Sequence, residues 1–94
     1  MNAFFSALAK LWADGASRRG AAIAPPELDP AVADQLLELT RVVAHTKERS
    51  FAPLASFTAG VASERLRSAK GADAAQIADY IREVREALER EAGT

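Results

Sequence analysis

Apolar residues recur every three or four positions along most of this chain, which is the spacing of helices with one buried face. The first such stretch covers 2–14, and its apolar positions are Phe4, Phe5, Leu8, Leu11 and Trp12. Gly15 is expected to end this helix. Residues 15–29 contain two glycines and the pair Pro25-Pro26, which cannot continue a helix, so we expect a connector there.

The second helix is predicted over 30–46. Asp29 can accept hydrogen bonds from the free backbone N–H groups of the first turn, and Pro30 suits that turn because it has no N–H to satisfy. The apolar positions of its buried face are Leu36, Leu37, Leu39, Val42 and Val43. The polar residues after position 44 mark its end.

The third helix is predicted over 53–69, with Pro53 in its first turn and Ser50 as a candidate cap. Its repeating apolar positions are Leu54, Phe57, Val61 and Leu66. Gly60 lies among them, and a glycine inside a helix costs about 1 kcal/mol relative to alanine. We therefore expect a neighbouring helix to pack closely against Gly60.

The fourth helix is predicted over 74–91. Gly71 can end the third helix, and Asp73 with Gln76 three residues later forms the pattern of a capping box. The apolar positions that follow are Ile77, Tyr80, Ile81, Val84 and Leu88. On the other faces, opposite charges stand four residues apart in the pairs Arg82–Glu86, Arg85–Glu89 and Glu86–Arg90.

Four amphipathic helices without internal repeats predict an all-α fold. A chain of 94 residues supports one small domain, so we expect a compact, bundle-like single domain over 1–94 with no large enclosed substrate cavity. The chain contains no cysteine, which excludes disulfides, thiolate metal sites and a cysteine nucleophile.

The charge balance bears on the choice of partner. Twelve basic and thirteen acidic residues give a net charge of −1, which argues against a nucleic-acid partner. The surplus of acid lies in 73–94, where six acidic residues stand against three arginines. No long apolar run is present, and Lys10 is the lone basic residue of the first helix, so we expect no membrane partner and a cytoplasmic location.

His45 is the single histidine and is the first candidate for acid–base chemistry. Its predicted place in the last turn of a helix also gives it a structural role, because an imidazole can interact with the terminal carbonyls. No glycine-rich phosphate loop, HExxH or GxSxG pattern accompanies it. We therefore expect no enzyme, no catalytic residue, no metal site and no cofactor.

A group of basic and polar residues precedes the third helix: His45, Lys47, Arg49 and Ser50. Helix N-termini present free backbone donors to anions, so a phosphate could dock at this corner. Pro53 removes one donor and Glu48 opposes an anion, which leaves a solvated loop over 45–53 as the alternative interpretation.

The second and third predicted helices also carry a string of short motifs. In order these are LLELTRVVAH (36–45), ER (48–49), APL (52–54) and FTAGVA (57–62). The string resembles a small uncharacterised actinobacterial family of helical domains, found alone or fused to molybdenum cofactor guanylyltransferases. The resemblance implies a helper or regulatory module in molybdenum cofactor maturation, and it implies no reaction.

These features together predict a non-catalytic accessory or protein-interaction module. The resemblance implies that its partner is a molybdenum cofactor enzyme or a molybdoenzyme, held by a helix face or by the 45–53 loop. The alternative is a small binder of a phosphorylated pterin or nucleotide at His45, Lys47, Arg49 and Ser50. A third interpretation is a homodimer in which the apolar face of the first helix packs against a second copy.

Overall fold

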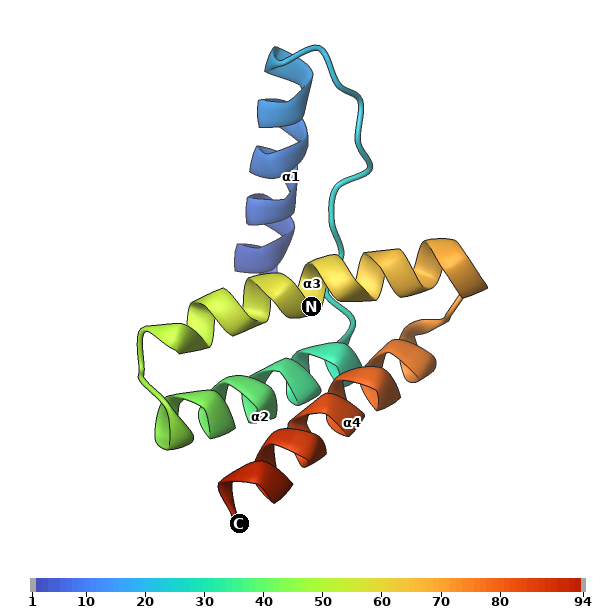
Figure 1. Cartoon of the computed structure of the whole chain (residues 1–94). Helices are drawn as coiled ribbons and strands as arrows, with labels where there is room; N and C mark the ends of the chain where they lie inside the picture. Colours follow the sequence, from blue (N-terminus) through green and yellow to red (C-terminus); the bar gives the residue numbers. More distant parts are fainter. Residues whose placement is uncertain (1, 94) are drawn as a thin grey trace. The chain divides into compact units, whose positions relative to one another are not determined.

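The computed structural model describes residues 2–93 and contains four helices. They are α1 (Ala3–Arg18), α2 (Pro30–Thr46), α3 (Phe51–Lys70) and α4 (Ala74–Ala92) (Figure 1). No strand occurs within this described range, and the predicted all-α fold is confirmed. The chain forms two compact units, Met1–Pro30 and Ala31–Thr94, and each is treated separately below.

Helix α1 of the first unit begins with a side-chain cap, because the Phe5 N–H donates to the Asn2 side-chain oxygen at 3.2 Å. The helix continues through Gly15, so the predicted end at residue 14 is wrong. It ends one turn later, where Gly20 adopts a left-handed φ of 81°. A glycine ends a helix only where the backbone takes such a conformation, and Gly15 stays helical.

The end of α1 is a Schellman motif. The Gly20 N–H donates to the Ser17 carbonyl at 3.0 Å, and the Ala21 N–H donates to the Ala16 carbonyl at 2.9 Å. These bonds satisfy carbonyls that a helix otherwise leaves without a partner. The connector that follows is correspondingly shorter than the predicted 15–29.

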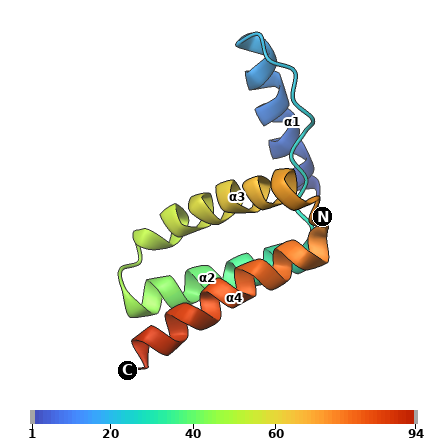
Figure 2. The same cartoon turned by 45° about the vertical axis from the view of Figure 1, so that its right-hand side comes forward.

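Within the first unit the connector returns along α1 (Figures 1 and 2). A shallow hollow of about 200 Å³ is lined by both segments: Phe5, Ser6 and Ala9 from α1, and residues 25–28 from the connector. Ala9 is buried, whereas Phe4, Leu11 and Trp12 remain exposed. The predicted burial of these three large side chains is therefore wrong, because the connector contacts a different face of the helix.

The second unit is built from α2, α3 and α4, joined by short turns over 47–50 and 71–73 (Figure 2). Its buried core comprises Leu39, Val43, Ala72, Ile77 and Ile81. Partly buried apolar residues from all three helices pack around it: Val32, Leu36, Ala55, Ala59, Leu66 and Leu88. Leu37, predicted as part of the buried face of α2, is exposed, since it lies about 100° around the helix from Leu36.

Helix α3 begins at Phe51, two residues before the predicted start. The Phe51 N–H donates to the Glu48 carbonyl at 3.1 Å, so the preceding turn leads directly into the helix. Ser50 makes no capping hydrogen bond, and the prediction that it caps α3 is wrong. Its hydroxyl instead donates to the Glu48 carboxylate at 3.4 Å.

The buried side of α3 is only partly the predicted one, since Leu66 packs against the core as expected. Leu54 and Phe57 are exposed, while Ala55 and Ala59 pack against the core. A Cβ added at Gly60 would meet no atom within 4 Å, so the predicted close packing at Gly60 is wrong. Alanines and large apolar residues both recur at helical spacing in α3, and the prediction assigned burial to the larger ones.

Helix α4 starts as predicted. The Gln76 N–H donates to the Asp73 carboxylate at 2.9 Å, and the Asp73 N–H donates to the Gln76 side chain at 2.8 Å. Gly71 ends α3 with a left-handed φ of 66°. Of the predicted ion pairs, Arg85–Glu89 forms at 2.8 Å, whereas Arg82 pairs with Asp79 at 2.9 Å.

Candidate functional site

The most distinctive surface feature of the second unit is an apolar hollow of about 240 Å³, which we call the α3–α4 groove. Its floor is formed by Leu39 and Ile81, which are 4% and 3% exposed. One wall comes from α3 and the other from α4, as follows: Ala55, Thr58, Ala59 and Ala62, facing Tyr80, Val84 and Leu88. The groove therefore opens directly over the core.

The sequence explains why a groove remains at this place. Residues 55, 59 and 62 share one helical face, and alanine at each of them leaves space beside the backbone of α3. The Thr58 hydroxyl donates to the Ala55 carbonyl at 2.8 Å. The polar group of the α3 wall therefore has its hydrogen-bond partner within α3. Tyr80, Val84 and Leu88 recur every four residues on α4 and form a wall of larger side chains.

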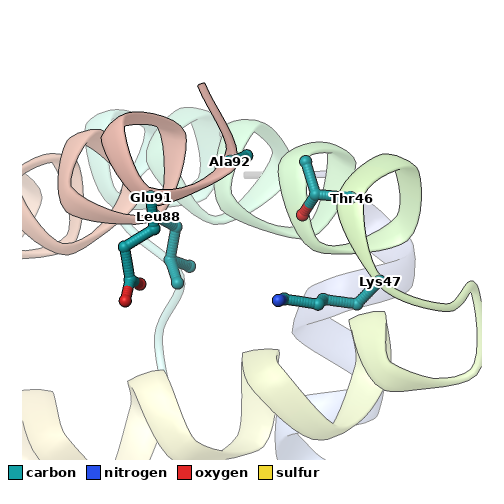
Figure 3. Close-up of a pocket in the computed structure, with 5 residues that line it drawn as sticks. All are labelled: Thr46, Lys47, Leu88, Glu91 and Ala92. Atoms are coloured by element: carbon teal, nitrogen blue, oxygen red, sulfur yellow. The ribbon is translucent and has the colours of Figure 1, made fainter. Parts of the chain in front are cut away.

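A second hollow, of about 430 Å³, lies where α2 and α4 end, and we call it the Lys47 hollow. It is lined by Thr46, Lys47, Leu88, Glu91 and Ala92. In Figure 3 the side chains of Lys47, Leu88 and Glu91 face the same space. Leu88 also lines the α3–α4 groove, so the two hollows adjoin at this residue.

Of the four predicted binding residues, Lys47 alone lines a hollow described above. The other three are exposed: His45 lies in the last turn of α2, and Arg49 and Ser50 lie on the turn between α2 and α3. Their binding of an anion stays a prediction.

Backbone geometry weakens the case for an anion at the start of α3. The Phe51 N–H donates to the Glu48 carbonyl, and the Ala52 N–H donates to the Arg49 carbonyl at 3.2 Å. Pro53 has no N–H to offer. The donors that would meet an anion at a helix N-terminus are therefore largely engaged or absent.

The shifted pKa values belong to residues outside both hollows. Arg41 donates a hydrogen bond to Glu38 at 2.7 Å, and this bond lowers the pKa of the Glu38 carboxyl and raises the pKa of the Arg41 guanidinium. The positive charge of Arg85 on α4 lowers the pKa of Glu38 further. The α3–α4 groove offers mainly apolar contact, with the Tyr80 phenol as its one ionisable group.

Within residues 2–93, no three or more His, Asp or Glu side chains lie together so that they could hold a metal ion. Nor is any helix in this range long and apolar enough to cross a membrane.

From the sequence, the groove residues of α4 were assigned to a buried face, the alanines of α3 were given no role, and the groove was missed as a site. Val84 fits the apolar rhythm of α4 as well as Ile81 does, yet Val84 is exposed and Ile81 is buried. The available signal was the row of alanines at 55, 59 and 62, because small side chains on one helix leave room beside large ones on the next.

A domain family of unknown function, DUF6457, matches residues 6–94, and the chain belongs to this family. No significant match was found among curated proteins or among solved structures. The predicted membership of an uncharacterised domain family is thus confirmed. The actinobacterial origin and the fusion to molybdenum cofactor guanylyltransferases stay predictions.

Proposed function

We propose that this member of the family is a non-catalytic protein-interaction module that holds an amphipathic helix of a partner protein in the α3–α4 groove. The observation that carries the proposal is an exposed apolar wall above a buried apolar floor. Val84 is 44% exposed although it lies one turn from Ile81, a core residue. Recognition of a helix in a groove uses apolar anchors of this kind.

The size of the groove favours side chains over a cofactor. Sites for small molecules generally enclose about 300–1,000 Å³. The groove, at about 240 Å³, is below this range and suits the apolar side chains on one face of a helix. Its alanine wall lets the backbone of such a helix approach α3 closely.

Charge along α4 defines the chemistry of the partner. Glu83 follows Tyr80 by three residues and Glu91 follows Leu88 by three, so acidic side chains border the α4 wall. Both glutamates belong to the segment in which acidic residues outnumber basic ones by six to three. The partner helix should therefore carry leucine or aromatic residues on one face and lysine or arginine on the flank beside α4.

We place this partner in molybdenum cofactor biosynthesis or delivery. The support is the resemblance of residues 36–62 to domains fused to molybdenum cofactor guanylyltransferases. The same segment supplies Leu39, Ala55 and Ala59 to the groove. A guanylyltransferase of this pathway, or a molybdoenzyme that receives its product, is the partner to test first.

The test measures binding of a purified molybdenum cofactor guanylyltransferase from the same organism to the full chain. Val84→Arg places a bulky cation in the groove and should weaken binding by more than about tenfold while helix content stays unchanged. Leu37→Arg is the matched control, because Leu37 is exposed on α2 and lines neither hollow. Equal affinity of the two variants would exclude the groove as the docking site.

A second candidate function is favoured by the size of the Lys47 hollow, which falls within the range of small-molecule sites. A phosphorylated pterin or nucleotide would contact Lys47, with His45 in the last turn of α2 and Arg49 and Ser50 on the turn that follows. Glu91 and the negative ends of two helix dipoles oppose a phosphate there, so we rank this function second. Calorimetry with guanosine monophosphate tests this function. The double variant Lys47→Glu with Arg49→Glu should lose binding of the nucleotide. Unchanged affinity in the double variant would exclude this site.

A further inference from the structure

Among residues 2–93, rows of large exposed apolar residues occur on α1 and on α3, and neither row lines the α3–α4 groove. We call them the α1 face and the α3 outer face. The first comprises Phe4, Leu11 and Trp12, and the second comprises Phe51, Leu54 and Phe57. Single exposed apolar residues are ordinary on proteins, but rows of large ones mark surfaces that contact another molecule.

The α3 outer face arises because this helix is apolar on two sides. Ala55 and Ala59 pack against the core, and Leu54 and Phe57 point away from it. Gly60, next to Phe57 on the outer side, has no neighbour within reach of an added Cβ. A surface helix needs one apolar stripe, so the second stripe of α3 serves no packing within its own unit.

The α1 face has a similar origin. The connector contacts α1 beside Phe5 and Ala9, and leaves Leu11 and Trp12 on another side of the helix. At one end of this face Phe4 packs edge-on against Phe5, with ring centroids 5.1 Å apart. The ring pair and the indole of Trp12 give the α1 face a large, stiff apolar surface.

The apolar area of the two faces indicates which molecule covers them. A buried aromatic side chain contributes about 150–250 Å². Four aromatic residues of the faces are between 45% and 73% exposed, and together they offer roughly 500 Å² per chain: Phe4, Trp12, Phe51 and Phe57. Two chains that cover each other's faces would bury roughly 1,000 Å² from these rings alone, and the leucines and bordering residues bring the total into the 1,200–2,000 Å² of a stable interface.

Pairing of one face with its own copy would reach only about half of this area, below the size of a stable interface. The charges at the borders also suit the pairing of the α1 face with the α3 outer face of a second copy. Lys10 and Asp14 border the α1 face, and Glu64 and Arg65 border the α3 outer face, so each face offers both signs to the other.

We propose that a second copy of this chain covers both faces, with α1 of each copy packed on the α3 outer face of the other. The arrangement is a two-fold dimer with two identical contacts, which closes and leaves no face open for further growth. The α3–α4 groove takes no part in these contacts. Failure of the dimer and failure of the proposed helix docking are therefore separate results.

Light scattering on the full chain, from low micromolar to millimolar concentration, tests the dimer. We expect twice the mass of the chain at the upper end. Leu11→Glu and Leu54→Lys should each raise the dimer dissociation constant by more than about tenfold with unchanged helix content. Leu37→Glu, an exposed apolar position outside both faces, should leave the dimer intact.

Mixing the two variants tests the reciprocal geometry. A pair of one Leu11→Glu chain and one Leu54→Lys chain keeps one unaltered contact and brings opposite charges together in the other. The mixture should regain the dimer that each variant alone has lost. A single-chain mass of the unaltered protein at every concentration, or a mixture that stays monomeric while the unaltered protein dimerises, overturns the proposal.

Discussion

Helices α3 and α4 follow each other in the chain and contact each other in space, yet they use their apolar residues in opposite ways. On α4 the large residues Ile77 and Ile81 are buried, and charged residues occupy much of the remaining surface. On α3 the small residues Ala55 and Ala59 pack inward, and the large residue Phe57 faces outward. Size and burial coincide at Ile77 and Ile81 of α4, and they separate at Ala55, Ala59 and Phe57 of α3.

This difference bears on what each helix does. A helix that buries its large residues contributes most to the stability of the unit, because stabilisation grows with the apolar area removed from water. A helix that buries alanines contributes less, and it keeps its large residues available for another molecule. We therefore assign the core mainly to α2 and α4, and we assign α3 the two surfaces proposed for binding.

The largest effect is expected at the core of α4. Ile77 is 1% exposed, and Ile77→Ala should lower the free energy of unfolding by about 2–5 kcal/mol. Urea denaturation followed by circular dichroism measures this value. Phe57→Ala on α3, compared at a concentration where the chain is monomeric, should change it by less than about 0.5 kcal/mol. If Ile77→Ala and Phe57→Ala lowered the free energy of unfolding by similar amounts, the contrast between the two helices would not hold.

A smaller effect is expected where the helices begin. Asp73→Ala removes the carboxylate that accepts from the Gln76 N–H and keeps the backbone N–H that donates to the Gln76 side chain, and it should lower the free energy of unfolding by about 1 kcal/mol. Ser50→Ala at the start of α3 should have almost no effect, because the Ser50 side chain caps nothing. Thermal unfolding of both variants measures the two effects. A loss of stability in Ser50→Ala as large as that in Asp73→Ala would contradict the prediction.

The same contrast explains which parts of the fold the sequence predicted. Helical spacing located all four helices, and the capping box fixed the start of α4, because these signals are local. Burial was predicted correctly for Ile77 and Ile81, where the large residues form one stripe. It was wrong for Leu54 and Phe57, because two stripes of α3 share the helical period and only the tertiary arrangement decides which one faces the core.

The candidate site was less predictable than the fold. Lys47 was expected from its charge and its place just before the third helix, and it does line a hollow, although this hollow lies where α2 and α4 end. The groove joins Ala55 and Val84, which are far apart in the sequence. Val84 was predicted to be a core residue, and Ala55 was given no role. A hollow between two helices depends on how far apart they are held, and a one-dimensional pattern does not contain that distance.

The smallest effect, and the one of opposite sign, is expected at Gly60 on α3. Its backbone is helical and an added Cβ meets no atom within 4 Å, so Gly60→Ala should raise the free energy of unfolding by about 0.5–1 kcal/mol. Gly71 supplies the control, since its left-handed φ of 66° makes Gly71→Ala destabilising. Urea denaturation at a concentration where the chain is monomeric isolates the effect within one copy. A loss of stability for Gly60→Ala under these conditions would mean that another segment packs against the outer side of α3, and the contrast between α3 and α4 would then no longer hold.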